Sequence, residues 1–159
     1  MSRRSTKHCG GNTSPAQQRI NRAKSVATLA HLFQLNFPHG ARLIVLTYYS
    51  GRYVPVGAYA EPDIVAWLRQ SARQLGGGFQ YVRSTEHGPA PIHRVITSIQ
   101  RAEAEALAVH WEYGPARVEE IAGGQLPALA EQIAGKPGAY CRSRRHSWTT
   151  SKGLLPWLL

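Results

Sequence analysis

Apolar residues in this chain recur in two ways, at the helical spacing of three and four residues and as short continuous or alternating runs. The helical spacing predicts a first helix from Ser14 to Phe37, because Ser14 offers a capping hydroxyl and is followed by proline at the first helical position. A second helix is predicted to begin near Pro62 and to end at the glycines Gly76–Gly78. Two further helices are expected over residues 101–111 and 127–135.

The runs between these helices are predicted to be strands. The segment LIVLTYY, residues 43–49, is apolar and β-prone, as a central strand would be. Residues 79–84 and 92–99 alternate, and the turn sequence HGPAP between them predicts an antiparallel hairpin. A short strand is expected over residues 117–121. This order of elements is typical of an α+β sandwich, a small antiparallel sheet of about four to five strands with helices packed on one face.

The two ends of the chain differ from its middle in composition. A length of 159 residues suits one domain, which we expect over residues 14–138, after a disordered basic arm at 1–13. Residues 139–159 are expected to be a basic tail, irregular until it docks. Because no apolar run has the length of a spanning helix or signal peptide, we expect a soluble, cytoplasmic protein with no membrane partner. The cysteines Cys9 and Cys141 suit a reducing compartment and lack a metal-binding spacing.

Charge is segregated along the sequence, which has a formal net charge of +10. Residues 1–60 contain eight Lys or Arg and no carboxylate, all nine acids lie between Glu61 and Glu131, and residues 132–159 contain five cations and no acid. Because each neutralised phosphate releases condensed counterions, two acid-free basic ends favour a nucleic-acid partner. A merely solubilising basic surface is the first alternative. A basic helix at a membrane surface is the lesser one, since the cationic stretches lack a large apolar face.

The candidate nucleic-acid contacts lie in both basic regions. The early turns of the first helix and the motif RSRRHSW supply cations for phosphates and one tryptophan for base stacking, the combination that single-stranded nucleic acid requires. These residues are Arg19, Arg22, Lys24, Arg142, Arg144, Arg145 and Trp148. The aromatic residues Tyr49, Trp67 and Trp111 sit in periodic apolar segments and are assigned first to the core.

Five segments of the chain, taken in order, resemble the segments of a known family, and together they cover most of the chain from Ser14 onward. They are NFPHGARLIVLTY (36–48), DIVAWLRQSAR (63–73), FQYVRSTEHG (79–88), PIHRVI (91–96) and HWEYGPARVEEI (110–121). This series resembles the small HUH-type rolling-circle replication initiator proteins of Firmicute plasmids, phages and integrative elements. The resemblance implies an HUH/RRM-like sandwich that nicks single-stranded DNA.

In that family, a His-hydrophobic-His triplet on a strand holds a divalent cation, and a tyrosine on a nearby helix attacks the scissile phosphate. Two positions of this chain depart from the pattern. The triplet position reads Pro91-Ile92-His93, so proline replaces the first ligand. The segment ALAEQ, residues 128–132, has Gln132 where the tyrosine is expected. The resemblance therefore implies a degenerate member of the family.

Substitutes for the missing groups are available nearby. Glu86 and His87 end the strand before the hairpin turn and could approach His93, giving a site for Mg or Mn. Tyr140 is the candidate replacement nucleophile. The alternative for His93 is a buried structural histidine, since it lies among branched apolar residues.

Three functions follow as hypotheses. The first is a nucleic-acid-binding protein with a degenerate nicking site, with single-stranded DNA favoured as the ligand. The second is an active metal-dependent nickase with a rearranged site. The third is a mobile-element or phage protein that uses the inactivated fold to inhibit a host nucleic-acid machine such as a CRISPR effector. It would bind a host protein or ribonucleoprotein through its acidic middle, Glu103 to Glu131, or mimic a ligand of that machine.

Overall fold

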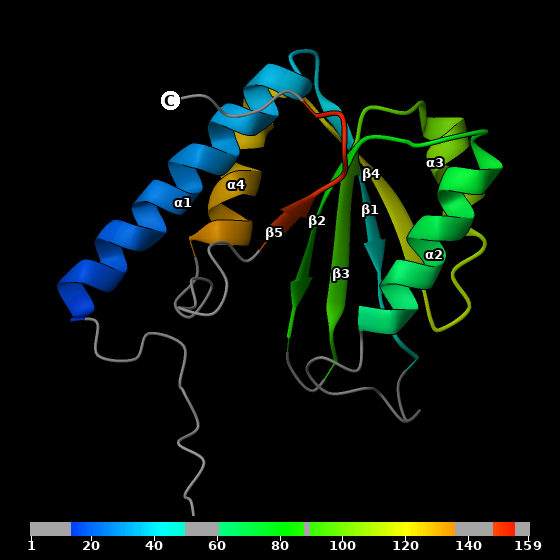
Figure 1. Ribbon diagram of the computed structural model, residues 1–159, viewed down its shortest axis with the longest axis horizontal. Coiled ribbons are helices and arrows are strands. Elements are labelled where there is room, and N and C mark those ends of the chain that lie inside the picture. The colour runs from blue at the N-terminus through cyan, green and yellow to red at the C-terminus, as the bar shows by residue number, and fades with distance from the viewer. Residues whose placement is uncertain (1–13, 50–60, 88–89, 136–147, 155–159) are drawn as a thin grey trace, which may run out of the picture.

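The computed structural model describes residues 14–49, 61–87, 90–135 and 148–154 (Figure 1). Its elements follow one another along the chain as α1 (Pro15–Asn36), β1 (Ala41–Leu46), α2 (Glu61–Gln74), β2 (Tyr81–Glu86), β3 (Ile92–Thr97), α3 (Arg101–Ala108), β4 (Ala116–Ile121), the short 3₁₀ turn η2 (Gly123–Gln125), α4 (Leu126–Ala134) and β5 (Trp148–Thr150). None of the helices in these ranges is both long and apolar enough to cross a membrane.

The strands form one sheet of five strands in the order β4-β1-β3-β2-β5. Every neighbouring pair is antiparallel. The run from β1 through α2, β2, β3 and α3 to β4 has the split-βαβ connectivity of ferredoxin-like folds. The predicted α+β class, the antiparallel sheet and the β2–β3 hairpin are confirmed, and the hairpin register places Thr85 opposite His93.

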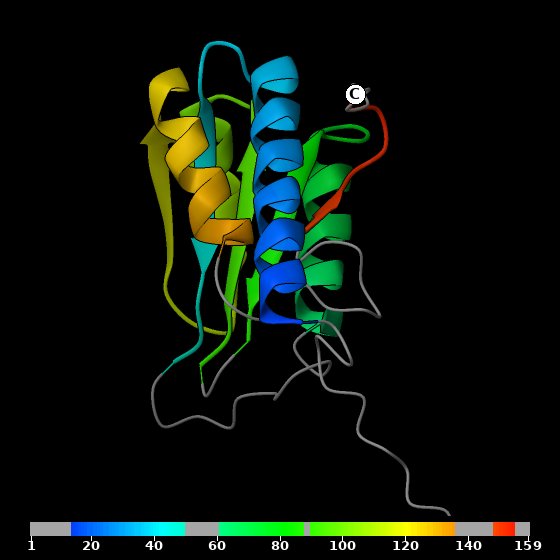
Figure 2. The same cartoon turned by 90° about the vertical axis from the view of Figure 1, so that its left-hand side faces the viewer.

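Helices cover both faces of this sheet (Figures 1 and 2). Ile44, Leu46 and Val95 pack with α2 and α3 on one face. On the other face, Leu43 and Val45 pack with α1 and α4, which lie side by side in front of the sheet in Figure 2. We expected helices packed on one face, and α2 and α3 do share a face, but α1 and α4 cover the opposite one as well. The run of apolar residues in β1 follows from this arrangement, because both faces of the strand are buried.

Local sequence signals set the ends of the first two helices as predicted. The Ser14 hydroxyl accepts a hydrogen bond from the backbone N–H of Gln17 at 3.1 Å, and Pro15 follows at the first helical position. After α2 the chain turns at Gly76 and Gly77, whose φ angles of 77° and 140° favour glycine.

Two sequence-based expectations are corrected by the fold. Part of the predicted irregular tail is strand β5, which pairs with the edge of β2. Tyr49, predicted to lie in the core, is 51% exposed because it follows the end of β1. Trp67 and Trp111 are buried as predicted, and each indole N–H donates to a backbone carbonyl, that of Leu107 or of Thr47.

Candidate functional site

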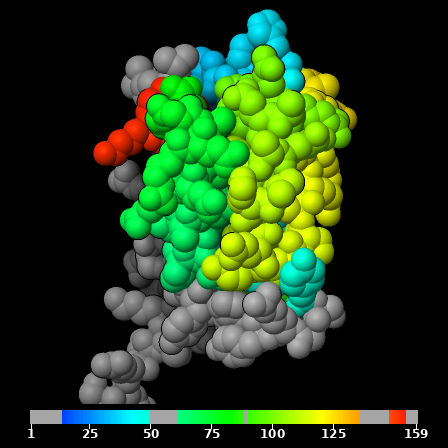
Figure 3. Space-filling model, turned by 90° about the vertical axis from the view of Figure 1, so that its right-hand side faces the viewer, coloured from blue at the N-terminus to red at the C-terminus, as the bar shows by residue number. Residues whose placement is uncertain are grey.

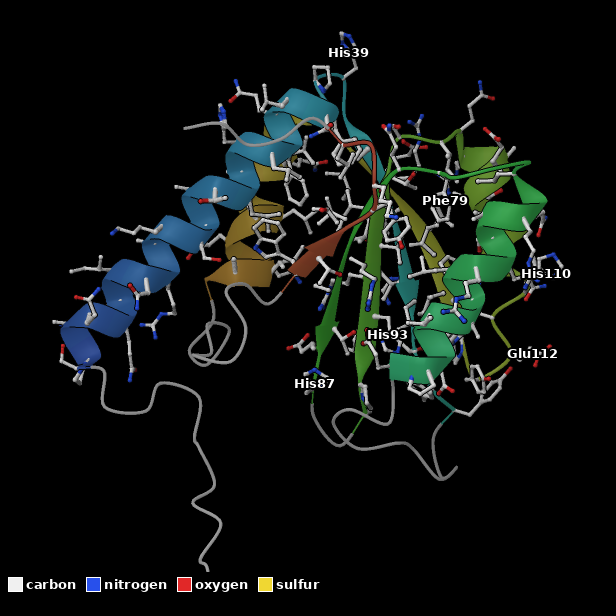
Figure 4. All side chains as sticks on the ribbon, viewed as in Figure 1. His39, Phe79, His87, His93, His110 and Glu112 are labelled. Carbon is white, nitrogen blue, oxygen red and sulfur yellow. The ribbon has the colours of Figure 1, made fainter. Side chains whose placement is uncertain are left out.

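His93 lies in the middle of the sheet, on the face covered by α2 and α3 (Figure 4). Its side chain is fully buried, at 0% exposure. Strand alternation points it to the same side as its cross-strand neighbours Leu46 on β1 and Thr85 on β2. The histidine at the centre of the sequence hypotheses is therefore an interior residue.

Both ring nitrogens of His93 are hydrogen-bonded to side chains. Nδ1 lies 2.8 Å from the Thr85 hydroxyl, and Nε2 lies 3.0 Å from the Tyr48 hydroxyl. The Tyr48 hydroxyl donates to the Asp63 carboxylate at 3.0 Å, so its oxygen is left to accept from Nε2–H. We assign His93 as the Nε2–H tautomer, with Thr85 donating to Nδ1, because only this arrangement satisfies the whole chain.

Aromatic rings enclose this chain of hydrogen bonds. The ring centroid of His93 lies 5.6 Å from that of Trp111 and 5.7 Å from that of Tyr48, both in edge-on geometry. Tyr113 packs against both Tyr48 and Trp111. This chain of hydrogen bonds thus lies among apolar rings, where an unpaired polar atom would destabilise the fold.

The environment holds His93 and Tyr48 in their neutral forms. The pKa of His93 is lowered from 6.5 to about 4, chiefly by burial; the charge of Glu61 opposes this shift, and Arg83 and His87 add to it. Burial, and then the hydrogen bond to Asp63 and its negative charge, raise the pKa of Tyr48 above its ordinary value. At neutral pH His93 is an uncharged imidazole and Tyr48 an intact phenol.

The expected metal site of Glu86, His87 and His93 is not assembled. The two-residue period of β2 sends the Glu86 side chain to the face opposite His93, where its carboxylate accepts from Arg94 at 2.9 Å. His87 is exposed just beyond the end of β2. Within the described ranges, no three His, Cys, Asp or Glu side chains converge as a metal site requires.

The helix expected to carry the nucleophile lies on the other side of the sheet. Helix α4 packs with α1 over Leu43, Val45 and Ile96, whereas His93 faces α2. Gln132 is an exposed residue of α4. The β3 positions that share the α4 face are Ile92, Arg94 and Ile96, none of which is a usual metal ligand. Tyr140 lies outside the described residues, so its role as replacement nucleophile stays a prediction.

The hydrogen bonds around His93 hold neighbouring elements of the fold together. Through Thr85, His93, Tyr48 and Asp63 the hydrogen bonds connect β2, β3, the segment after β1, and α2. Sequence reasoning missed three of these four residues. A strict β2–β3 register would have placed Thr85 opposite His93, but the meeting of Tyr48 with Asp63 depends on how α2 packs on the sheet.

The predicted nucleic-acid contacts have different outcomes. Arg19, Arg22 and Lys24 lie in the first half of α1, with Arg19 and Lys24 exposed and Arg22 partly exposed. Trp148 is 6% exposed and packs in the core between the sheet and the α1–α4 pair. The predicted role of Trp148 in base stacking is therefore wrong. Arg142, Arg144 and Arg145 lie outside the described residues.

The fold and this site define a small α+β domain whose five-stranded sheet has helices packed on both faces and contains a buried, neutral histidine. Comparisons of the chain with protein-family models, with curated proteins and with solved structures found no match.

Proposed function

We propose that this chain is a nucleic-acid-binding protein that favours single-stranded DNA and resembles a rolling-circle replication initiator with a degenerate nicking site. The observation that carries the proposal is the basic first half of α1. The resemblance of the five sequence segments and the acid-free ends of the chain support it independently.

The first half of α1 is not needed for packing against the sheet. No residue from Ser14 to Lys24 is buried, and the buried side of the helix begins at Ser25. Figure 1 shows this dark blue part of the helix extending away from α4 and the sheet. It carries three cations, and the whole of α1 contains no carboxylate. A cationic helix held clear of the core suits contacts with phosphates.

The buried geometry supports the degenerate part of the proposal. A nucleophile on α4 and a cation held at His93 would be separated by the sheet, because α4 and His93 lie on opposite faces. In-line attack on a phosphate requires the reacting groups within about 3.5 Å of each other. The residues at the family's two positions therefore suit a domain that holds a strand without cleaving it.

The acidic middle of the chain favours nucleic acid over an acid-mediated protein partner. Three of its carboxylates are paired with arginines: Glu105 with Arg101, Glu119 with Arg117, and Glu120 with Arg42. The segment from Glu103 to Glu131 therefore presents mixed charge on α3 and β4, and an uninterrupted acidic surface is not formed by its described residues.

The proposal is tested by the anisotropy of a labelled single-stranded oligonucleotide at low salt. Changing Arg19, Arg22 and Lys24 together to Gln should weaken binding about ten-fold or more, since it removes three phosphate contacts. The matched control changes Arg73, Arg101 and Arg117 to Gln, which removes the same charge from exposed positions of α2, α3 and β4. Equal losses in the two variants, or no binding by the unmodified chain, would contradict the proposal.

A nicking assay tests the degenerate site separately. Incubation with single-stranded or supercoiled DNA and Mg²⁺ or Mn²⁺ is expected to give neither nicked product nor a covalent protein–DNA adduct, because the groups at positions 93 and 132 cannot meet. A covalent adduct that disappears in a Tyr140→Phe variant would instead support the rearranged nickase.

A further inference from the structure

A groove lies between α2 and the β2–β5 edge of the sheet, with a cavity volume of about 310 Å³. One wall is a single face of α2, made by Val65, Leu68, Arg69 and Ala72 at positions three and four apart. The opposite wall is formed by β2 and by the residues that follow β5. Figure 3 shows those residues, in red, beside the upper part of the green α2.

The floor of the groove is apolar and aromatic. Phe79 and Tyr81 line it, with ring centroids 5.0 Å apart and planes tilted by 44°. Phe79 is nearly buried, whereas Tyr81 is partly exposed and so has surface left for a ligand. Leu68 and Ala72 continue the apolar floor from the helix side. A flat apolar group would find stacking and packing partners there.

The rim of the groove is cationic. Arg69 and Lys152 are exposed on its two sides, one from α2 and one from the segment after β5. Arg83 lies deeper and is held by an ion pair with Glu61. The lining contains no Asp or Glu among the described residues. Two cations without a facing carboxylate favour an anion at the mouth of the groove.

The wall after β5 is held in place by the backbone of β2. The Tyr81 N–H donates to the Ser151 hydroxyl at 2.8 Å, and the Ser151 N–H donates to the Tyr81 carbonyl at 2.9 Å. The Gln80 side-chain amide adds a bond to the Gly153 carbonyl at 2.8 Å. Lys152 therefore projects from a segment anchored to residues 80 and 81, on the side of the groove opposite α2.

We propose that this groove binds one nucleotide of a single-stranded nucleic acid, with the base against Tyr81 and the phosphate between Arg69 and Lys152. This inference rests on the proposed function and names a second contact surface, distinct from the basic half of α1 and from the His93 compartment. A cavity of about 310 Å³ lies at the small end of the range for ligand sites, which suits a single nucleotide. Base stacking on an aromatic ring combined with cations on the phosphate is the usual chemistry of such a contact.

The test is an NMR titration of the ¹⁵N-labelled full chain with thymidine monophosphate, thymidine and inorganic phosphate as separate probes. The nucleotide is expected to shift the backbone amide signals of Arg69, Tyr81 and Lys152 saturably, at a lower concentration than thymidine or inorganic phosphate alone. If inorganic phosphate gives the same shifts at the same concentration, the base contact is wrong. If the nucleotide leaves these amides unshifted, the whole inference is wrong.

Variants separate the contribution of each wall. Arg69→Gln with Lys152→Gln should weaken nucleotide binding about ten-fold, whereas Arg73→Gln with Arg101→Gln, an equal loss of exposed charge outside the groove, should leave it unchanged. Tyr81→Leu should remove the advantage of the nucleotide over phosphate. Equal affinity in the groove variant and the unmodified chain would overturn the inference.

Failure of the groove and failure of the proposed function give different results. The change of Arg19, Arg22 and Lys24 to Gln leaves the groove residues untouched. If this variant keeps full oligonucleotide affinity while the nucleotide still shifts the groove amides, the α1 surface is wrong and the groove stands. If oligonucleotide binding depends on α1 but the groove amides never respond, the groove alone is wrong.

Discussion

The same residue type can be a metal ligand or an interior hydrogen-bonding group, and at His93 its neighbours decide between the two. Thr85 and Tyr48 occupy both ring nitrogens, which leaves no lone pair for a cation. From the sequence, the apolar residues around His93 already indicated burial. The partners could not be predicted, because Asp63 and Tyr48 meet only once α2 lies on the sheet.

Protonation of His93 should destabilise the fold in acid. Its folded pKa of about 4 lies below the ordinary value of 6.5, so the unfolded chain takes up the proton first. The stability due to the neutral imidazole is complete above pH 6.5 and is lost as the pH falls through about 4. We expect roughly 3 kcal/mol of unfolding free energy to be lost between pH 7 and 4 from this group. Denaturant unfolding across this range measures it.

The control for this prediction is a His93→Gln variant, which cannot titrate at this position. Its stability should depend less steeply on pH between 7 and 4, because the imidazole that the fold keeps neutral is absent. The comparison concerns the slope and not the absolute stability, which the substitution itself lowers. Parallel pH profiles for the two proteins would show that the imidazole is not held neutral by the fold.

Secondary structure was predictable where the signals were local. The Ser14–Pro15 start of α1, the glycine stop of α2 and the β2–β3 hairpin all follow from neighbouring residues. Strand β5 was missed because it has only three residues, in a basic segment without alternation, and exists through pairing with β2. The apolar run of β1 indicated that both faces of the sheet are covered. Which helices cover the second face was not indicated, because α1 and α4 come from opposite ends of the domain.

Gly114 is the residue on which the junction of β1 and β4 depends. A Cβ at this position would lie 2.4 Å from the carbonyl oxygen of Thr47 and 2.6 Å from the Cα of Tyr48. Because both are backbone atoms, Gly114→Ala must separate the end of β1 from the segment before β4. We expect a loss of about 1–3 kcal/mol in the free energy of unfolding. Denaturant unfolding followed by tryptophan fluorescence measures this loss.

Gly124→Ala provides the matched control, since nothing lies within 4 Å of a Cβ built there. Its stability should stay within about 0.5 kcal/mol of the unmodified chain, as for most surface changes. If Gly114→Ala proved equally neutral, the close approach of these two segments would not be a constraint on the fold.

At the scale of the whole molecule, the fold buries His93 and presents two basic surfaces outside the core. The first surface, on α1, was predictable because Arg19, Arg22 and Lys24 are close in the sequence. The second, the groove beside α2, was not, because Arg69 and Lys152 are brought to one edge only by the pairing of β5 with β2. The separation of α4 from His93 by the sheet was not predictable for a related reason, since sequence spacing does not reveal on which face of a sheet a helix will pack.

The central claim is that the basic half of α1 holds a single strand through its phosphates. The most direct test is the salt dependence of oligonucleotide affinity for the unmodified chain and for the variant with Arg19, Arg22 and Lys24 changed to Gln. The logarithm of the affinity should fall linearly with the logarithm of the salt concentration, and the variant's slope should be smaller by about 2, since each single-strand phosphate contact contributes about 0.7. Identical slopes for the two proteins, or an affinity insensitive to salt, would contradict the account.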